Sequence, residues 1–340
     1  MVKRLLTRLT DTIYDLPVLV LMPHSRCNCR CVMCDIWKAN NDKKEISDEL
    51  LQKHIDDFRK LGIQRVALSG GEALMHSNLW KLCRQLKKIG IKISLLSTGI
   101  TLKANAPQII QYVDDVIVSL DGSPEIHNQI RNLPSAYEKL SEGVFALKDI
   151  DPHFPITGRC VIQRLNYLHF TDIIATAKAL ELDQISFLAA DVSSSAFNRS
   201  EPWQEEQVVK IELTEKEVRE FERIVKDSFH QFTELYHDRY IAESPEKMLD
   251  IVTYYKALLG MHDFPKKKCN APWVSAVIES DGEVKPCFFH PSYGNINKNN
   301  FREIINSKEA ISFRKKLDME KDPICERCVC SLHLGLTQRP

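Results

Sequence analysis

The feature of the sequence that most constrains its fold is a repeated alternation of strand-like runs with helical patterns. Residues 61–70, Leu-Gly-Ile-Gln-Arg-Val-Ala-Leu-Ser-Gly, are echoed by residues 89–99, Ile-Gly-Ile-Lys-Ile-Ser-Leu-Leu-Ser-Thr-Gly. Each run follows a helical pattern that stops at a glycine, Gly62 or Gly90, as helices commonly do. Strands and helices that alternate with short links predict an α/β fold with a parallel sheet, either open or curved into a barrel.

Six strand-like runs can be counted before about residue 190, and eight cannot. The other four lie at residues 18–22, 115–120, 156–163 and 184–188. Beyond residue 190 the chain becomes polar without a period, and a capping box at residues 214–217 opens a helix. We therefore expect three parts: a core of residues 1–212, a helical connection of residues 213–262 and a small domain of residues 263–340.

Composition excludes several classes of protein. The chain has 340 residues with 46 basic and 46 acidic side chains, and its longest apolar run covers only residues 16–22. A membrane helix needs roughly 20 apolar residues, so no membrane partner is expected. Zero net charge gives no general attraction for nucleic acid. Charged residues interrupt the apolar core that a signal peptide would need after the basic start, which favours a cytoplasmic location.

Eleven cysteines call for a chemical explanation, because a core of this size needs no disulfides. Grouped cysteines in such a chain more often bind metal than form a disulfide framework. The two groups are Cys27, Cys29, Cys31 and Cys34 near the start and Cys269, Cys287, Cys325, Cys328 and Cys330 near the end. Cys83 and Cys160 stand alone in apolar patterns, and we expect both to be small buried side chains.

The spacing Cys27-x3-Cys31-x2-Cys34 places three thiols directly after the first expected strand. Catalytic groups of parallel sheets gather at the carboxyl ends of the strands. Three thiolates can hold three corners of a four-iron cluster and leave the fourth iron open, as catalytic metal sites require. Cys29 would compete for the same loop space, and we interpret it as a bystander. The alternative is a zinc site built from Cys31, Cys34 and two further cysteines.

With this loop after its first strand, the sequence resembles the radical S-adenosylmethionine (SAM) enzymes, whose fold is a six-stranded partial barrel. Gly70-Gly71-Glu72, after the second strand, is similar to the family's Gly-Gly-Glu segment, which binds the amino group of the SAM methionine. The resemblance thus implies a SAM site at these three residues, where glycine suits a close approach of backbone to ligand. Residues 97–99, Ser-Thr-Gly, depart from the family's frequent Thr-Asn-Gly.

Two further segments carry the resemblance. Ser119-Leu-Asp121-Gly, after the fourth strand, is similar to the family's Ser-Leu-Asp-Gly segment near the ribose and carboxylate of SAM. This likeness implies cofactor contacts for Ser119 and Asp121. Leu188, at the end of the sixth strand, matches the position that usually flanks adenine.

The late cysteines resemble those of the SPASM or twitch domains that some radical SAM enzymes carry. The pattern is Cys269-x12-Gly-x4-Cys287 followed by Cys325-x2-Cys328. It implies one auxiliary 4Fe-4S cluster held by these four cysteines, with Cys330 as a substitute ligand or a spare. A full SPASM domain carries two clusters and needs more cysteines downstream. A structural zinc is the alternative, because four thiolates suit zinc equally well.

The resemblance implies the chemistry. SAM binds the open iron, an electron from the cluster cleaves its sulfonium bond, and the resulting 5′-deoxyadenosyl radical removes a substrate hydrogen atom. An electron donor such as flavodoxin or ferredoxin is the implied partner. Residues near strand ends could assist, although a surface salt bridge is the expected role of any single one and no base is assigned; they are Arg131, Arg159, Arg164 and His169.

The expected substrate is a small polar molecule such as a sugar, cyclitol or nucleoside, oxidised or rearranged in natural-product biosynthesis. Few residues precede the first strand, whereas peptide-modifying relatives often carry a leader-binding module there. Radical modification of a ribosomally made peptide is the alternative within the same enzyme class. An iron-sulfur electron carrier or sensor without SAM chemistry is the alternative outside it.

Overall fold

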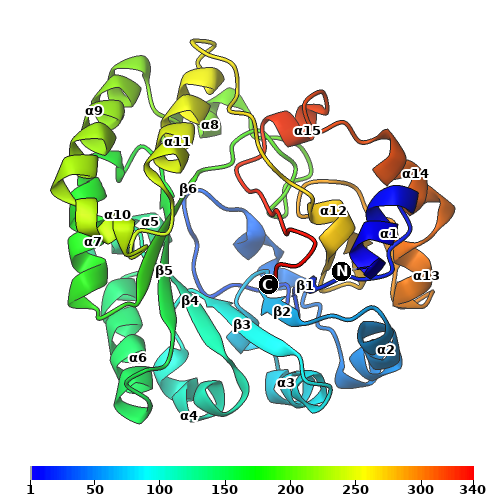
Figure 1. Cartoon of the computed structure of the whole chain (residues 1–340). Helices are drawn as coiled ribbons and strands as arrows, with labels where there is room; N and C mark the ends of the chain where they lie inside the picture. Colours follow the sequence, from blue (N-terminus) through cyan, green and yellow to red (C-terminus); the bar gives the residue numbers. More distant parts are fainter. Residues whose placement is uncertain (1) are drawn as a thin grey trace.

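The computed structural model describes residues 2–340, and one curved sheet organises it. Six parallel strands form the barrel part, each paired with the next in the chain. They are β1 (Val18–Leu21), β2 (Arg65–Leu68), β3 (Lys92–Ser97), β4 (Asp115–Ser119), β5 (Ile156–Ile162) and β6 (Gln184–Ala189). Figure 1 shows the sheet bent around an open lumen, with its edges apart. The expected six-stranded partial barrel is thereby confirmed.

Helices cover the outer face of this sheet (Figure 1). They include α2 (Asp48–Lys60), α3 (Leu79–Lys88), α4 (Leu102–Tyr112), α5 (Pro124–Arg131), α6 (Ala136–Ile150) and α7 (Phe170–Ala179). Burial alternates along the strands, so that Leu19 and Leu21 of β1 and Val66 and Leu68 of β2 are fully enclosed against the helices. The residues between them turn to the lumen and stay partly exposed, which leaves space for a ligand inside the barrel.

A helical segment closes the side of the barrel next to β6. It consists of α8 (Glu205–Ile211), α9 (Glu215–Gln231), α10 (Thr233–His237) and α11 (Pro245–Leu258). The expected capping box is present, with Thr214 and Glu217 bonding each other's backbone amides. From α11, the hydroxyl of Tyr255 donates to the carbonyl of Ile162 at 2.5 Å, and that of Tyr254 donates to Ala190 at 3.2 Å. These bonds fix α11 to the ends of β5 and β6.

The C-terminal part extends the barrel sheet beyond β1. Strand β7 (Ser275–Ile278) runs parallel to β1, with Val18 opposite Ser275. Strand β8 (Glu283–Lys285) pairs antiparallel with β7, which confirms the expected hairpin, and β9 (Gly294–Asn295) follows. The remaining helices are α12 (Ala271–Val274), α13 (Phe301–Ile305), α14 (Lys308–Lys316) and α15 (Pro323–Glu326). The first strand of this part is therefore continuous with the barrel sheet.

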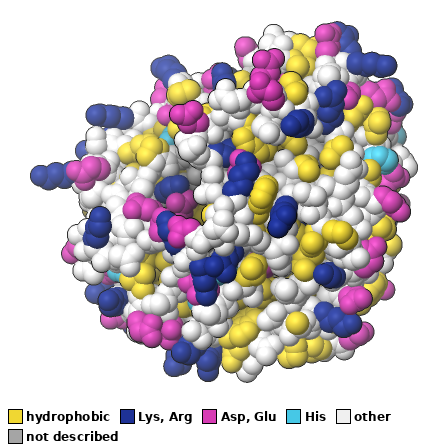
Figure 2. Space-filling model, turned by 180° about the vertical axis from the view of Figure 1, so that it is seen from behind, with side chains coloured by type: hydrophobic (Ala, Val, Ile, Leu, Met, Phe, Trp, Pro, Cys, Tyr) yellow, Lys and Arg dark blue, Asp and Glu magenta, His cyan; other side chains and the backbone are white. Residues whose placement is uncertain are grey.

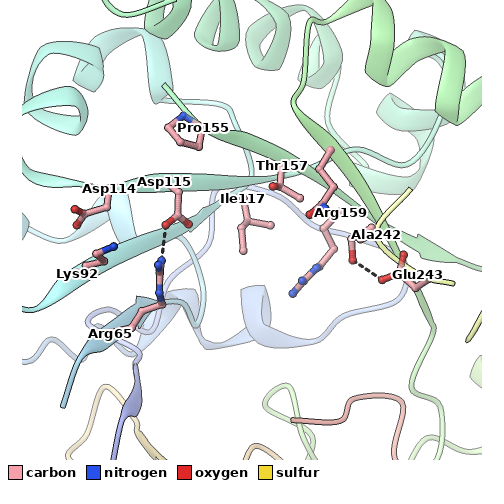
Figure 3. A pocket seen from close by; sticks show the side chains of 12 residues that line it. Arg65, Lys92, Asp114, Asp115, Ile117, Pro155, Thr157, Arg159, Ala242 and Glu243 are labelled. Carbon is pink, nitrogen blue, oxygen red and sulfur yellow. Dashed lines mark hydrogen bonds and ion pairs between the residues drawn. The ribbon is translucent and has the colours of Figure 1, made fainter. Parts of the chain in front are cut away.

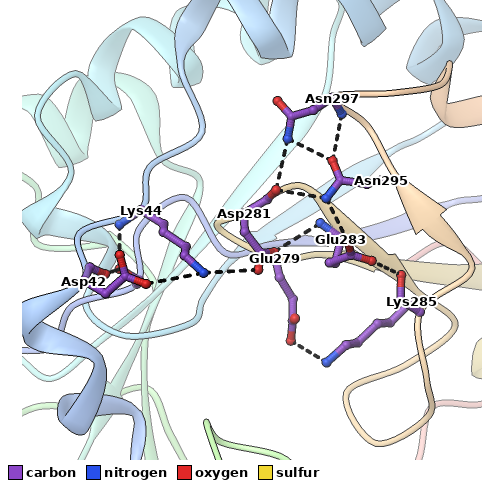
Figure 4. Close-up of polar contacts among 10 residues, drawn as sticks. Asp42, Lys44, Glu279, Asp281, Glu283, Lys285, Asn295 and Asn297 are labelled. Atoms are coloured by element: carbon purple, nitrogen blue, oxygen red, sulfur yellow. Dashed lines mark hydrogen bonds and ion pairs between the residues drawn. The ribbon is translucent and has the colours of Figure 1, made fainter.

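The hairpin turn is tied to the barrel by polar contacts (Figure 4). Asp281 lies 3.7 Å from the ammonium group of Lys44, and its carbonyl accepts from the side-chain amides of Asn295 and Asn297 at 3.1 and 3.0 Å. Gly282 follows with a φ of +90°, and a Cβ there would lie 2.4 Å from the Asn297 side chain. Only glycine fits this turn without strain.

The N-terminal helix and the C-terminal residues lie side by side, near α12 and β1 (Figure 1). Arg4 of α1 (Val2–Thr10) donates to the carbonyl of Gly335 at 2.9 Å. Charged side chains of both signs are interspersed over the face seen in Figure 2, in keeping with zero net charge. Among residues 2–340, no helix combines the length and apolar character needed to cross a membrane.

Candidate active site

The loop that follows β1 is held in place from both sides. The backbone amide and carbonyl of Cys27 bond the Asn40 side chain at 2.9 Å each. On the other side, the amides of Arg30 and Val32 donate to the carbonyls of Arg131 and Ile130, at the end of α5, at 3.1 and 3.0 Å. This loop, residues 23–35, is called the cysteine loop below. The backbone that carries its three spaced thiols is thus held by hydrogen bonds to elements distant in the chain.

The thiols of the cysteine loop lie within electrostatic reach of one another. Burial, followed by the negative charge of Cys31, raises the pKa of Cys34 to about 12. Burial also raises the pKa of Cys27 to about 12, with Cys31 and Cys34 adding to the effect. Cys31 differs, because hydrogen bonding to Cys29 and the charge of Arg131 lower its pKa to about 6. A bound metal centre would stabilise all three as thiolates.

Within residues 2–340, one group of three potential ligands lies close enough to hold a single ion: His290, Asp322 and Cys325, whose ligand atoms all lie within 4.8 Å of one another. The three thiols of the cysteine loop are not gathered in this way, and by their chemistry thiolates suit either a zinc ion or an iron-sulfur cluster.

Glu72 lies beside this loop and is fully buried. Its Oε2 accepts from the amide and hydroxyl of Thr98 at 2.7 Å each and from the Ser97 hydroxyl at 3.1 Å. Its Oε1 accepts from the amide of Leu74 at 3.1 Å, and burial raises the pKa of the carboxyl group. The structure thus joins the Gly-Gly-Glu and Ser-Thr-Gly segments, at the ends of β2 and β3, through one carboxylate.

Gly71 allows β2 to approach the cysteine loop. A Cβ on Gly71 would lie 2.0 Å from the carbonyl oxygen of Arg26, and the amide of Glu72 donates to that same oxygen at 2.8 Å. Gly70 beside it is close to Met22 in the same manner. At Gly71 a close approach is made to the protein's own backbone.

The Ser-Leu-Asp-Gly segment divides between the lumen and the interior. Ser119 and Leu188 follow lumen-lining Ile117 and Ser186 by two residues, so they face the lumen, and both stay partly exposed. Asp121 is fully buried instead, and its carboxylate pairs with Arg131 at 2.6 Å. The structure therefore brings Ser119 and Leu188 to the expected cofactor side but gives Asp121 a protein partner.

Of the four charged residues expected at strand ends, two form surface pairs. Arg164 pairs with Glu217 at 3.1 Å, and His169 pairs with Asp172 at 3.0 Å. The same expectation is wrong for Arg131, which is 6% exposed and donates to the sulfur of Cys31 at 3.4 Å. Its position twelve residues after Ser119, on the helix that follows the motif, was the only signal in the sequence.

A cavity of about 690 Å³ is lined mostly by residues at the amino-terminal ends of the strands, such as Arg65 of β2, Lys92 of β3 and Asp115 of β4 (Figure 3). Most of its charged groups have protein partners: Arg65 bonds Asp115 at 2.5 Å and Ser94 at 2.6 Å, while Glu243 accepts from Ser186 at 2.9 Å. Arg159 of β5 points into the cavity, and its Nε has no hydrogen-bond partner among the residues that the structure describes.

The late cysteines gather beside the open edge of the barrel. Negative charge on Cys287 raises the pKa of Cys325, Cys328 and Cys330, after the larger effect of burial, and Cys269 does the same to Cys287. Cys287 is thus near all the others. The charge of Arg159 partly offsets the rise that burial causes in the pKa of Cys330.

Two further residues near the cysteine groups were not predicted. His290 is buried, with Nε2 3.3 Å from the sulfur of Cys325 and 3.6 Å from the carboxylate of Asp322. Arg199 donates to the carbonyl of Met33 at 3.3 Å and pairs with Asp191 at 2.9 Å. The contacts of His290 with Cys325 and of Arg199 with Met33 join segments far apart in the chain, and no local pattern marks them.

Comparison with known families matches both halves of the chain. Residues 21–176 match the radical SAM superfamily, and residues 269–329 match the SPASM iron-sulfur cluster-binding domain. The AdoMet-dependent heme synthase of Methanosarcina barkeri is 26% identical over 90% of this chain and 87% of its own length. AlbA, the subtilosin biosynthesis protein of Bacillus subtilis, is 23% identical over 83% of this chain, but the match covers only 58% of AlbA.

Solved structures show the same fold. SuiB of Streptococcus suis, bound to its precursor peptide SuiA, superposes with a TM-score of 0.67 at 12% identity, covering 96% of this chain and 74% of SuiB. The peptide-bound enzyme anSMEcpe gives a TM-score of 0.62 at 21% identity, covering 91% of this chain and 87% of its own. At these identities the likeness concerns the arrangement of the backbone.

Proposed function

The chain belongs to the radical SAM superfamily and carries a C-terminal SPASM domain, and we propose that it removes a hydrogen atom from a small anionic molecule held in the barrel lumen. The superfamily's bound groups, SAM on a 4Fe-4S cluster, supply the radical that takes the hydrogen atom, and the SPASM domain adds an auxiliary iron-sulfur cluster. The chain's own residues hold these groups, bind the substrate and exclude water.

The ligands follow from the two cysteine groups. We assign Cys27, Cys31 and Cys34 to the SAM-binding cluster, in a loop fixed by Asn40 and α5. Gly70, Gly71, Glu72, Ser119 and Leu188 border the same end of the lumen and would surround SAM. The auxiliary cluster is assigned to Cys269, Cys287, Cys325 and Cys328, beside the open edge of the barrel.

Arg159 carries the proposal for the substrate. Arg159 is partly exposed and points into a cavity of about 690 Å³, and its Nε has no hydrogen-bond partner among the described residues. Its charge partly offsets the rise that burial causes in the pKa of Glu243, a carboxylate that also lines the cavity. A guanidinium group binds carboxylate or phosphate through two parallel hydrogen bonds. The expected small polar substrate therefore carries such a group, and Arg159 anchors it.

Other charged residues of the cavity already have protein partners and so are expected to position the substrate without attracting it by charge. Arg65 and Asp115 neutralise each other, as the short contact between them in Figure 3 shows. Glu243 is occupied by Ser186 and by the amide of Phe187. The cavity is lined by three basic and three acidic side chains, so its formal charge is zero and the preference for an anion rests on Arg159.

A peptide substrate is the second candidate, favoured by the names of the relatives. AlbA belongs to subtilosin biosynthesis, and PqqA peptide cyclase of Bradyrhizobium diazoefficiens is 23% identical over 52% of this chain. In that case an acidic side chain of the peptide would meet Arg159 in the lumen. An electron donor such as flavodoxin or ferredoxin would serve either reaction, and reduced thiols fit a cytoplasmic location.

The test measures 5′-deoxyadenosine formed by the anaerobically reconstituted enzyme with SAM and dithionite. One panel contains small anions, namely sugar acids, nucleotides and porphyrin carboxylates, and the other contains peptides with and without acidic residues. We expect a small anion to stimulate cleavage, Arg159→Met to raise its KM at least tenfold, and Arg159→Lys to restore part of the loss. Stimulation by neutral molecules alone, or equal KM in Arg159→Met, would contradict the anion anchor, and stimulation by peptides alone would favour the second candidate.

A further inference from the structure

Arg131 links a buried carboxylate to a sulfur of the cysteine loop. One terminal nitrogen, Nη2, lies 2.6 Å from Oδ2 of Asp121, and the other, Nη1, donates to Sγ of Cys31 at 3.4 Å. Asp121 is fully buried and Arg131 is 6% exposed. The guanidinium group is therefore held away from solvent, where electrostatic interactions are strong.

The carboxylate side of this link is fixed by several contacts. The carbonyl of Asp121 accepts from the Asn166 side chain at 3.0 Å, and its Oδ1 accepts from the amide of Val161 at 3.4 Å. The amide of Asp121 donates to Nδ1 of buried His127 at 3.3 Å. These bonds come from β5, the loop after it and α5, so Asp121 has little freedom to turn toward the lumen.

The sulfur side is fixed as well. The two residues that flank Cys31, Arg30 and Val32 on either side, bond the carbonyls of Arg131 and Ile130. Cys31 thus sits in a short backbone ladder with the same residue whose side chain reaches its sulfur. A rotation of α5 would move the ladder and the guanidinium group together, so the contact between Arg131 and Cys31 is built into the fold.

We propose that Arg131 is a positioning residue that orients Cys31 and raises the reduction potential of the cluster it ligates, with Asp121 as its counterion. The proposal depends on the assignment of Cys31 to the SAM-binding cluster. Reduction adds one negative charge to a cluster, and hydrogen bonds and positive charge at its sulfurs favour that state. The Ser-Leu-Asp-Gly aspartate then acts on the cluster through Arg131 and not on SAM.

The experiment is an EPR-monitored redox titration of the reconstituted enzyme with both clusters present. The SAM-binding cluster is identified by the change of its signal when SAM is added. Arg131→Met should shift its midpoint potential to more negative values, since a positive donor is lost. Asp121→Asn should shift it to more positive values, since the counterion is lost. Arg131→Lys should restore most of the wild-type potential.

The auxiliary cluster is the internal control, and its potential should stay unchanged in all three variants. Arg164→Met, which removes a surface pair with Glu217, is the matched control for the loss of an arginine. If Arg131→Met fails to bind the cluster, Asp121→Asn and Arg131→Lys still show in which direction the midpoint potential shifts. A wild-type potential in Asp121→Asn, or shifts of the same sign in Arg131→Met and Asp121→Asn, would overturn the proposal. A variant that no longer holds the SAM-binding cluster would instead show a lower iron content, so a wrong ligand assignment can be told apart from an unchanged potential.

Discussion

Thr98 donates two hydrogen bonds to the carboxylate of Glu72, one from its amide and one from its hydroxyl, both to the same oxygen at 2.7 Å. The side-chain amide of Asn28, in the cysteine loop, lies 2.8 Å from that hydroxyl. Glu72 therefore connects the ends of β2 and β3 with the loop that carries the cluster ligands. Any contact of Glu72 with SAM is made by a carboxylate that the protein already holds in place.

Replacing Glu72 by alanine should affect both stability and cofactor binding. The buried donors of Ser97 and Thr98 lose their acceptor, which should lower the free energy of unfolding by about 1–3 kcal/mol. SAM binding should weaken by roughly tenfold or more, about 1.4 kcal/mol, while the iron content stays the same. Denaturant unfolding and a SAM titration measure these effects, with exposed Glu206→Ala as the control. Wild-type SAM affinity in Glu72→Ala would exclude the proposed role.

Single alanine variants of Cys27, Cys31 and Cys34 should form no 5′-deoxyadenosine with SAM and dithionite. Each thiolate holds one corner of the cluster, so the loss of one opens a second iron. Cys29→Ala is the control, and it should retain both iron and SAM cleavage, although Cys29 is buried and contacts Cys31. Normal cleavage by any of the first three variants would remove that residue from the site, and loss of iron in Cys29→Ala would add Cys29 to it.

The parts of the fold that could be predicted are those with a local signal. The strand-like runs of β1 and β2 and the helix ends at Gly62 and Gly90 are written into short stretches of sequence. The pairing of β7 with β1 joins Ser275 to Val18, and only a contact between distant segments decides it. The sequence therefore predicted the barrel and the hairpin but not their union in one sheet.

The candidate site also divides into residues with a local sequence signal and residues whose role depends on contacts between distant segments. The cysteine spacing and the Gly-Gly-Glu segment lie in consecutive residues and could be recognised. The role of Asp121 could not, because it depends on Arg131, which reaches it from the end of α5. Likewise, Gly71 serves the approach of Arg26, a contact between two loops. A sequence motif can indicate that a residue has a functional or structural role, but the residue that it contacts is known only from the folded chain.

Gly71→Ala should displace the cysteine loop. The added Cβ would lie 2.0 Å from the carbonyl oxygen of Arg26 and would break the bond from the Glu72 amide to that oxygen. Overpacking of this kind costs about 1–3 kcal/mol. We expect the variant to lose iron from the SAM-binding cluster on gel filtration while keeping the auxiliary cluster. Gly335→Ala is the control, since its nearest neighbour would be 3.8 Å away. Full iron retention in Gly71→Ala would contradict this account of the loop.

Acid should destabilise the protein in part through His127. Burial lowers the pKa of His127 from 6.5 to about 3, so between these values the unfolded chain binds a proton that the folded chain does not. The stabilisation is complete above pH 6.5 and is lost as the pH falls toward the folded pKa, by up to about 1.4 kcal/mol per pH unit. Denaturant unfolding at several pH values should show a smaller slope in His127→Gln. Exposed His153→Gln should keep the wild-type slope, and an equal slope in both variants would contradict the prediction.

The auxiliary site gives a prediction that rests on counting iron. Two four-iron clusters require about eight irons per chain, and the triple variant Cys27→Ala/Cys31→Ala/Cys34→Ala should keep about four and remain brown. Cys287 lies near both Cys328 and Cys330, so the choice of the fourth ligand between these two is open to a direct comparison. In the triple background, Cys328→Ala should lose the remaining iron and Cys330→Ala should retain it, because Cys325-x2-Cys328 is the spacing assigned to the auxiliary cluster. The reverse result would make Cys330 the ligand.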